Sequence, residues 1–188
     1  MRHFVCMATG IDILPLRLAV LRQPGLWNQH RFRTASQDSP HREVDDILVR
    51  CQPLTKEWPD HRETLWYPAY EALPQVRTHV FSLMARVEGE RLGRVMITRL
   101  APGKQIYAHS DIGTDGLHYD TEPYWSRFHV LLQCPPEALF QAGKEIVWMP
   151  EGSCWWFDNT TLHRVWNDGQ EDRLTLIIDI HCAEAKTV

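Results

Sequence analysis

The sequence lacks a surplus of basic residues, since 20 Lys and Arg face 24 Asp and Glu and the formal net charge is −4. Binding to nucleic acid through bulk positive charge is therefore not expected. Cysteine pairs of the C-x-x-C type are also absent. An odd number of scattered cysteines argues against a disulfide framework or a zinc ribbon and favours reduced thiols in a cytoplasm. They are Cys6, Cys51, Cys134, Cys154 and Cys182.

Long apolar runs, internal repeats and low-complexity segments are missing as well. The apolar stretch near the N-terminus is interrupted by Gly10, Asp12, Pro15 and Arg17, and it is too short for a signal peptide or a membrane span. The length of 188 residues and the hydrophobic content of 44% are ordinary for one globular domain. We therefore expect a single domain over residues 1–188 that has no contact with a membrane.

The hydrophobic periodicity changes near residue 75. Residues 75–88 carry apolar side chains at helical spacing, which predicts a helix that ends at Gly89. Further on, short β-rich runs are separated by turns; they cover residues 95–100, 105–109, 127–134, 145–149, 154–157, 162–166 and 173–181. This pattern predicts a mainly β protein with flanking helices, a double-stranded β-helix of the jelly-roll or cupin-like type. Residues 1–75 would flank a core formed by residues 76–188.

One motif has the spacing of a metal site. His109 and Asp111 are two residues apart on a predicted strand, so their side chains point to the same face. His163, at the start of a later strand, is the third candidate ligand. Two histidines and one carboxylate form the facial arrangement that suits non-haem iron(II) and leaves coordination positions open. A bidentate 2-oxo acid and dioxygen could occupy those open positions.

An arginine accompanies the third candidate ligand. Arg173 follows His163 by ten residues, across the loop 167–172. The turn residues predict two hairpins, one joining 145–149 to 154–157 and the other joining 162–166 to 173–181. Arg173 would then return on the strand next to that of His163, where a guanidinium can bind a carboxylate in bidentate fashion.

From about Arg94 to His181 the sequence resembles the aspartyl/asparaginyl β-hydroxylase-like branch of the iron(II)/2-oxoglutarate oxygenases. The matching segments are LAPGKQIYAHSD, SRFHVLL and MPEGSCWWFDNTTLHRVWNDGQEDRLTLIIDIH. The resemblance implies a double-stranded β-helix that uses iron(II), 2-oxoglutarate and O2. It also implies that 2-oxoglutarate is converted to succinate and CO2 while an unactivated C–H bond is hydroxylated.

The resemblance also implies roles for single residues. His109 and His163 would bind the metal, and Arg173 would pair with the far carboxylate of 2-oxoglutarate. Thr98 stands where the family has a hydroxyl that assists this arginine. The R-x-H pair, Arg127 and His129, would contact the other end of the co-substrate.

The sequence departs from the family pattern at some positions. Asp111 stands where some members have Gly, so the carboxylate ligand is present here. Arg164 follows His163 where an acidic residue is frequent. The segment 112–126 between the two motifs is long and rich in Gly, Asp and aromatic residues, which makes it a candidate substrate lid.

Structural alternatives stay open for these residues. Asp111 could cap a turn, His163 could be a packed core histidine, and Arg173 could lie on the surface of a hairpin. Thr98 could be an ordinary strand residue, and Arg127 and His129 an exposed polar pair.

Three functions are compatible with the motifs. The first is hydroxylation of an amino acid that is free, carrier-bound or part of a peptide or protein, the β-carbon of Asp or Asn included. The second is a cupin-like metalloprotein, such as an isomerase, that does not use 2-oxoglutarate. The third is a non-catalytic binding module on the same barrel. Nothing in the sequence indicates the oligomeric state.

Overall fold

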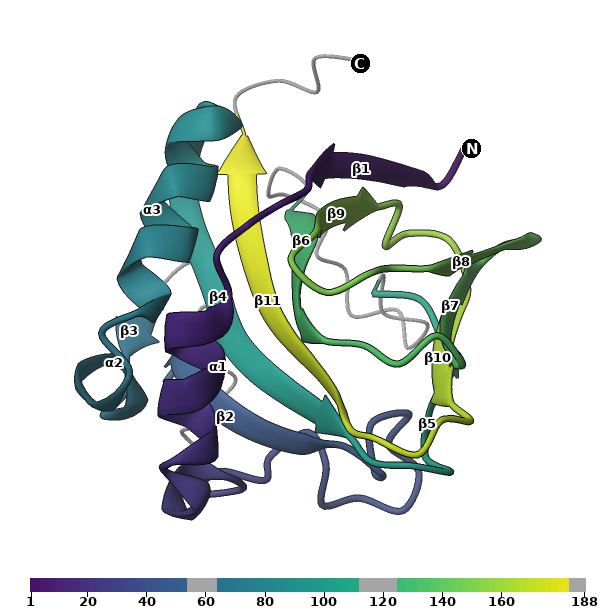
Figure 1. The fold of residues 1–188 in the computed structure, drawn as a ribbon, viewed down its shortest axis with the longest axis horizontal. Helices are drawn as coiled ribbons and strands as arrows, with labels where there is room; N and C mark the ends of the chain where they lie inside the picture. The colour runs from purple at the N-terminus through teal and green to yellow at the C-terminus, as the bar shows by residue number, and fades with distance from the viewer. Residues whose placement is uncertain (54–63, 112–124, 183–188) are drawn as a thin grey trace.

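The computed structural model describes residues 1–53, 64–111 and 125–182, in which antiparallel strands form two sheets that face each other (Figure 1). The large sheet has the order β1 (Phe4–Ala8), β9 (Cys154–Phe157), β6 (Ser126–Gln133), β11 (Arg173–Cys182), β4 (Gly89–Leu100), β2 (Asp45–Cys51) and β3 (Leu65–Trp66). The small sheet has the order β5 (Gln105–His109), β10 (His163–Asn167), β7 (Ala138–Ala142) and β8 (Glu145–Trp148). Residues 112–124, which hold most of the candidate lid, lie outside the described residues.

From β4 onward the chain passes back and forth between the two sheets. The strands β4, β6, β9 and β11 belong to the large sheet, whereas β5, β7, β8 and β10 belong to the small one. This alternation is the double-stranded β-helix, so the predicted fold class is confirmed. The N-terminal part contributes more than flanking elements, because β1 pairs with β9 and β2 pairs with β4.

Both predicted hairpins are wrong. β8 pairs with β7, a strand that the sequence analysis missed, while β9 pairs with β1 and β6 in the other sheet. β10 pairs with β5 and β7, while β11 pairs with β4 and β6. Arg173 therefore lies on the sheet opposite His163 and not on a neighbouring strand. A turn motif shows where the chain changes direction, but it does not determine whether the next strand pairs with the last one or crosses to the facing sheet.

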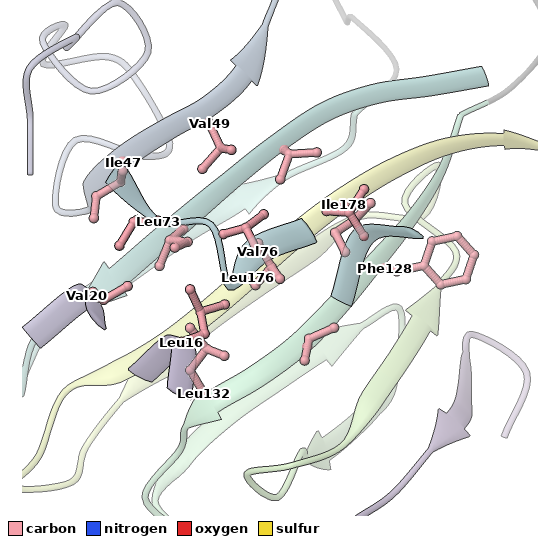
Figure 2. Packing of buried hydrophobic residues seen from close by; sticks show 14 of the residues in the cluster. Leu16, Val20, Ile47, Val49, Leu73, Val76, Phe128, Leu132, Leu176 and Ile178 are labelled. Carbon is pink, nitrogen blue, oxygen red and sulfur yellow. The ribbon is translucent and has the colours of Figure 1, made fainter. Parts of the chain in front are cut away.

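Helices cover the outer face of the large sheet (Figure 1). They are α1 (Leu14–Leu21), a short 3-10 turn (Pro24–Leu26), α2 (Ala69–Ala72) and α3 (Val76–Arg86). Leu16, Val20, Leu73 and Val76 pack there against Leu176 and its neighbours on the sheet (Figure 2). Burial of one such side chain stabilises the fold by roughly 1.5–3 kcal/mol. No helix in the described ranges is long and apolar enough to span a membrane.

The predicted helix is confirmed, but its end differs from the prediction. α3 stops at Arg86, and Glu88 adopts the left-handed conformation with φ of 51°. Gly89 already begins β4. A Cβ atom at Gly89 would lie 2.5 Å from Cγ2 of Ile180, so close packing against β11 explains the glycine.

Alternation along the strands divides the large sheet into an apolar and a polar face. On β11, Leu174, Leu176 and Ile178 belong to the core under the helices. The residues that alternate with them point to the other side, toward the small sheet. Arg173, before Leu174, and Asp179, after Ile178, belong to this second set, and both are buried. The space between the sheets therefore contains charged side chains, and these form the candidate site.

Candidate active site

The three predicted metal ligands come together between the sheets. His109 ends β5 and His163 begins β10, and the two residues are direct partners in the register of these strands. Asp111 follows β5, with its Oδ1 3.8 Å from Nε2 of His109. One ligand atom from each of the three residues lies within 4.8 Å of the others. Two nitrogens and one oxygen are thus placed to occupy one face of an octahedral metal ion.

Backbone carbonyls determine which imidazole nitrogen is free to bind a metal ion. Nδ1 of His109 lies 2.8 Å from the carbonyl oxygen of Tyr107, and Nδ1 of His163 lies 2.8 Å from that of Thr161. Because a carbonyl oxygen only accepts hydrogen bonds, each Nδ1 carries the proton. Each Nε2 is left with a lone pair, which is the tautomer that a metal ligand needs.

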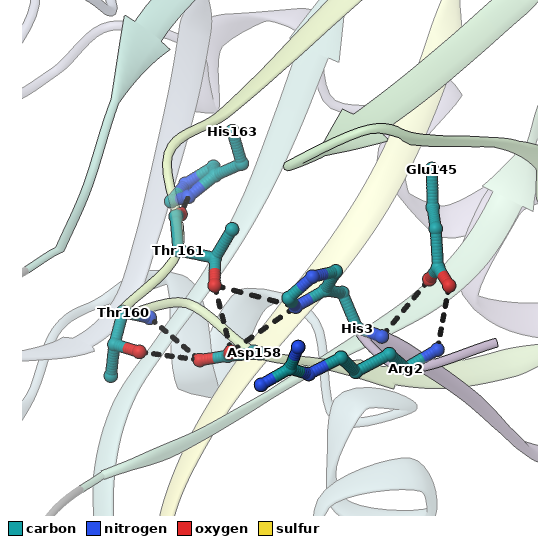
Figure 3. A network of polar contacts seen from close by, with 7 residues as sticks. All are labelled: Arg2, His3, Glu145, Asp158, Thr160, Thr161 and His163. Atoms are coloured by element: carbon teal, nitrogen blue, oxygen red, sulfur yellow. Dashed lines mark hydrogen bonds and ion pairs between the residues drawn. The ribbon is translucent and has the colours of Figure 1, made fainter.

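The turn before His163 is held by a polar network (Figure 3). The Asp158 carboxylate accepts hydrogen bonds from the hydroxyls of Thr160 and Thr161 and lies 3.3 Å from Nδ1 of His3. The backbone N–H of His3 donates to Glu145. The N-terminal strand is thereby tied to the turn whose Thr161 carbonyl orients His163.

The protonation states of the triad suit a divalent cation. Burial lowers the pKa of His163 to about 4 and also lowers that of His109, so both imidazoles are neutral near pH 7. Burial would raise the pKa of Asp111, but Arg127 and then His163 and His109 outweigh it and hold this pKa below its usual value. Two neutral nitrogens and one carboxylate are ligands that iron(II) accepts.

Arg127 fixes the carboxylate ligand. Its Nη1 donates to Oδ2 of Asp111 at 2.6 Å, while Nε and Nη2 donate to the two oxygens of Asp179 at 2.7 and 2.9 Å. Asp111 also accepts a hydrogen bond from the Asn159 side chain, and its backbone N–H donates to the Asn159 carbonyl at 3.0 Å. Burial would lower the pKa of Arg127, but Asp111 and Asp179 raise it, so the guanidinium stays charged. Oδ1 of Asp111 remains directed toward the histidines.

Polar atoms without partners are also buried between the sheets. Arg173 is 3% exposed, and its Nη2 is buried with no hydrogen-bond partner in the described part of the chain. The same holds for Nδ1 of His129 and Oγ1 of Thr175. Burial lowers the pKa of Arg173, and the nearby thiol of Cys134 offsets part of this effect. A buried guanidinium without a carboxylate is costly, so this end of the barrel suits an anionic ligand.

The predicted site residues occupy two levels of the barrel. His109, Asp111, His163, Arg127 and His129 line one pocket. Thr98 is buried on β4, directly opposite Thr175 of β11. Arg173 is opposite Leu100, two residues further along these strands. A ligand that runs from the triad toward Arg173 would pass along these residues.

The sequence analysis placed four polar or charged residues of the pocket region at no site. Arg33, His41 and Arg94 line the pocket, and Asp179 holds Arg127. Asp179 could have been found, since it follows Arg173 by six residues on one strand and so shares its face. Arg33 and His41 come from a loop before β2, and no local pattern marks them.

The chain folds as a double-stranded β-helix that carries a two-histidine, one-carboxylate candidate metal site. Residues 58–182 match the family described as aspartyl/asparaginyl beta-hydroxylase, and the chain belongs to this family. No curated protein matches the sequence.

Solved structures share the fold at low sequence identity. A prolyl-4-hydroxylase from Pseudomonas putida has a TM-score of 0.58 and 14% identity, with 96% of this chain and 91% of that chain covered. The viral collagen prolyl hydroxylase of Paramecium bursaria Chlorella virus-1, in its 2-oxoglutarate complex, has a TM-score of 0.57 and 12% identity over 97% of both chains. AviO1 from Streptomyces viridochromogenes has a TM-score of 0.56 and 14% identity, with 99% and 92% covered.

Proposed function

We propose that this protein is an iron(II)- and 2-oxoglutarate-dependent oxygenase that hydroxylates an unactivated C–H bond of an amino acid, either free, carrier-bound or within a peptide or protein. The observation that carries the proposal is the convergence of His109, Asp111 and His163, whose ligand atoms lie within 4.8 Å of one another, in a member of the aspartyl/asparaginyl beta-hydroxylase family. The β-carbon of Asp or Asn is one candidate position. The five free cysteines support a reducing compartment such as the cytoplasm.

The metal would be held by Nε2 of His109, Nε2 of His163 and Oδ1 of Asp111. Arg127 donates a hydrogen bond to Oδ2 of Asp111, which favours ligation of the metal by Oδ1 alone. Three coordination positions then stay open for the co-substrate and O2.

The co-substrate would lie between the triad and Arg173. The unpartnered guanidinium of Arg173 suits the far carboxylate, with Thr98 and Thr175 beside its path. His129, which is buried and unpartnered at Nδ1, suits the nearer end. Arg127 uses three of its five N–H donors on Asp111 and Asp179, so two are left for the co-substrate.

When bound, iron(II), 2-oxoglutarate and O2 supply the oxidising power for hydroxylation, with succinate and CO2 as by-products. The chain's own residues orient the ligands and limit the access of water. The carbonyls of Tyr107 and Thr161 hold the ligand tautomers, and Arg127 holds Asp111 in place. The apolar side chains of Phe140, Phe157 and Ile177 line the pocket and keep water from the reacting atoms.

Anaerobic titration of the metal-free protein tests this function. Iron(II) and 2-oxoglutarate together should produce a metal-to-ligand absorption band, which His163→Ala and Arg173→Ala should weaken. Aerobic incubation should yield succinate. If iron binds but 2-oxoglutarate produces no band and Arg173→Ala changes nothing, a metalloprotein without 2-oxoglutarate replaces the proposal. Binding of both, with no succinate on any substrate, would favour the non-catalytic binding module.

A further inference from the structure

Among the described residues, three arginines line the pocket beside the triad: Arg33, Arg94 and Arg127. Two of them have carboxylate partners. Arg33 donates from Nε and Nη2 to the buried Asp46, at 2.7 Å in both cases. Arg127 is bound by Asp111 and Asp179. The charges of these two arginines are therefore balanced within the protein.

Arg94 differs from the other two. Its Nη2 makes one long hydrogen bond of 3.4 Å to the Gln52 side chain, and its side chain lies beside the Cys51 thiol. Its Nε is buried and has no hydrogen-bond partner, and no carboxylate in the described ranges pairs with it. A half-buried cation whose direct hydrogen-bond partners are all neutral is stabilised when an anion binds.

The excess charge remains when the site is loaded as proposed. The two negative charges of 2-oxoglutarate balance the two positive charges of the metal. Three carboxylates then face four guanidinium groups in and beside the pocket: Asp46, Asp111 and Asp179 against Arg33, Arg94, Arg127 and Arg173. One positive charge is left over. Because the other pocket arginines are paired and Arg173 would serve the co-substrate, this charge resides at Arg94.

His41 lies in the same pocket. Its ring packs edge-on against His109 with centroids 4.6 Å apart, and its Nδ1 is buried with no partner in the part that the structure describes. Arg33 and His41 precede the residues 58–182 that match the family. The side of the pocket that Arg33 and His41 form therefore comes from the N-terminal part of the chain.

We propose that Arg94, assisted by His41, binds a carboxylate of the substrate and so selects substrates that carry a single negative charge near the reacting carbon. This inference rests on the proposed function and deepens it. The planar guanidinium matches a carboxylate. A single carboxylate matches the single excess charge, whereas a phosphate dianion would exceed it.

Binding of matched acid and amide probes tests the proposal. The probes are N-acetyl amides of Asp, Asn, Glu and Gln, titrated anaerobically into the protein loaded with iron(II) and 2-oxoglutarate. Binding is followed by calorimetry and by the change in the absorption band. In the wild type an acid should bind about 10–100 times more tightly than its amide, because a charge-assisted hydrogen bond contributes that much. Arg94→Gln should bring this ratio near one, and Arg94→Lys should retain part of it.

Arg77→Gln is the matched control, since it removes the same charge from a partly exposed side chain of α3 that does not line the pocket, and it should keep the wild-type ratio. His41→Gln should reduce the ratio without abolishing it, which provides a second arm if Arg94→Gln does not fold. Equal binding of acid and amide by the wild type, or no binding of any acidic probe, overturns the inference. If the wild type forms no band with iron(II) and 2-oxoglutarate, the proposed function itself fails, and that outcome is separate.

Discussion

Replacement of Arg173 by Met is expected to stabilise the metal-free protein and at the same time to abolish tight binding of 2-oxoglutarate. The guanidinium lies inside the barrel at 3% exposure, with Nη2 unpartnered among the described residues and a thiol as its polar neighbour. Methionine has a similar length and fills the space without a charge. Stability should rise because the buried charge is costly in the metal-free protein. Affinity for 2-oxoglutarate should fall because the same charge pairs with its carboxylate.

The expected magnitudes follow from this burial. Replacing buried charges by apolar side chains of similar volume stabilises proteins by about 1–4 kcal/mol. For a chain of this size each kcal/mol raises the melting temperature by roughly 2–4 °C. Loss of a bidentate, charge-assisted contact to a carboxylate should weaken 2-oxoglutarate binding about 100-fold, which corresponds to roughly 2.7 kcal/mol.

Two measurements on the Arg173→Met variant test both effects. Urea denaturation of the metal-free protein measures the free energy of unfolding, and the anaerobic absorption band measures 2-oxoglutarate affinity. Arg77→Met, at a partly exposed side chain of α3 outside the pocket, should change both by little. A variant that loses more than about 1 kcal/mol of stability, or that binds 2-oxoglutarate as tightly as the wild type, would refute the reasoning.

Three further predictions concern the scaffold. Asp158→Ala removes the acceptor that holds the turn before His163, so metal affinity measured by competition with a chelator should fall about 10–100-fold, whereas the exposed Asp168→Ala should not change it. Between pH 6.5 and about 4 the unfolded chain binds a proton at His163 that the folded chain, with its lowered pKa, does not bind. The free energy of unfolding of the metal-free protein should therefore fall on acidification through this window, by ~3 kcal/mol from this residue, and His163→Gln should flatten the urea-derived pH profile. Gly89→Ala places a Cβ 2.5 Å from Ile180 and should cost about 1–3 kcal/mol, whereas an unchanged melting temperature would show that β11 can shift.

Local spacing accounts for the parts of the site that could be predicted. His109 ends β5 and Asp111 lies two residues further on, and the spacing of two brings both side chains to the same side although Asp111 is outside the strand. The R-x-H pair on β6 follows the same rule, and both of its residues line the pocket. The apolar stripe of α3 likewise depends on residues that are close in sequence.

Strand pairing could not be predicted from the turns. The loop after β10 looks like a hairpin turn, but it crosses to the facing sheet because β10 is already paired on both sides by β5 and β7. Arg173 nevertheless points into the barrel, because its alternation on β11 places it on the face opposite the helix-covered core.

The sequence by itself determined the class of fold, the helix before the strands and the three residues of the candidate metal site, because hydrophobic period and side-chain chemistry act over a few residues. Only the tertiary structure decided which strands are neighbours, that Arg127 is shared by Asp111 and Asp179, and that Arg94 lies in the pocket without a carboxylate. Arg33 and His41 reach that pocket from a loop far away in the chain. Charge balance in a buried site depends on distances between such segments, and those distances exist only once the two sheets have closed around it.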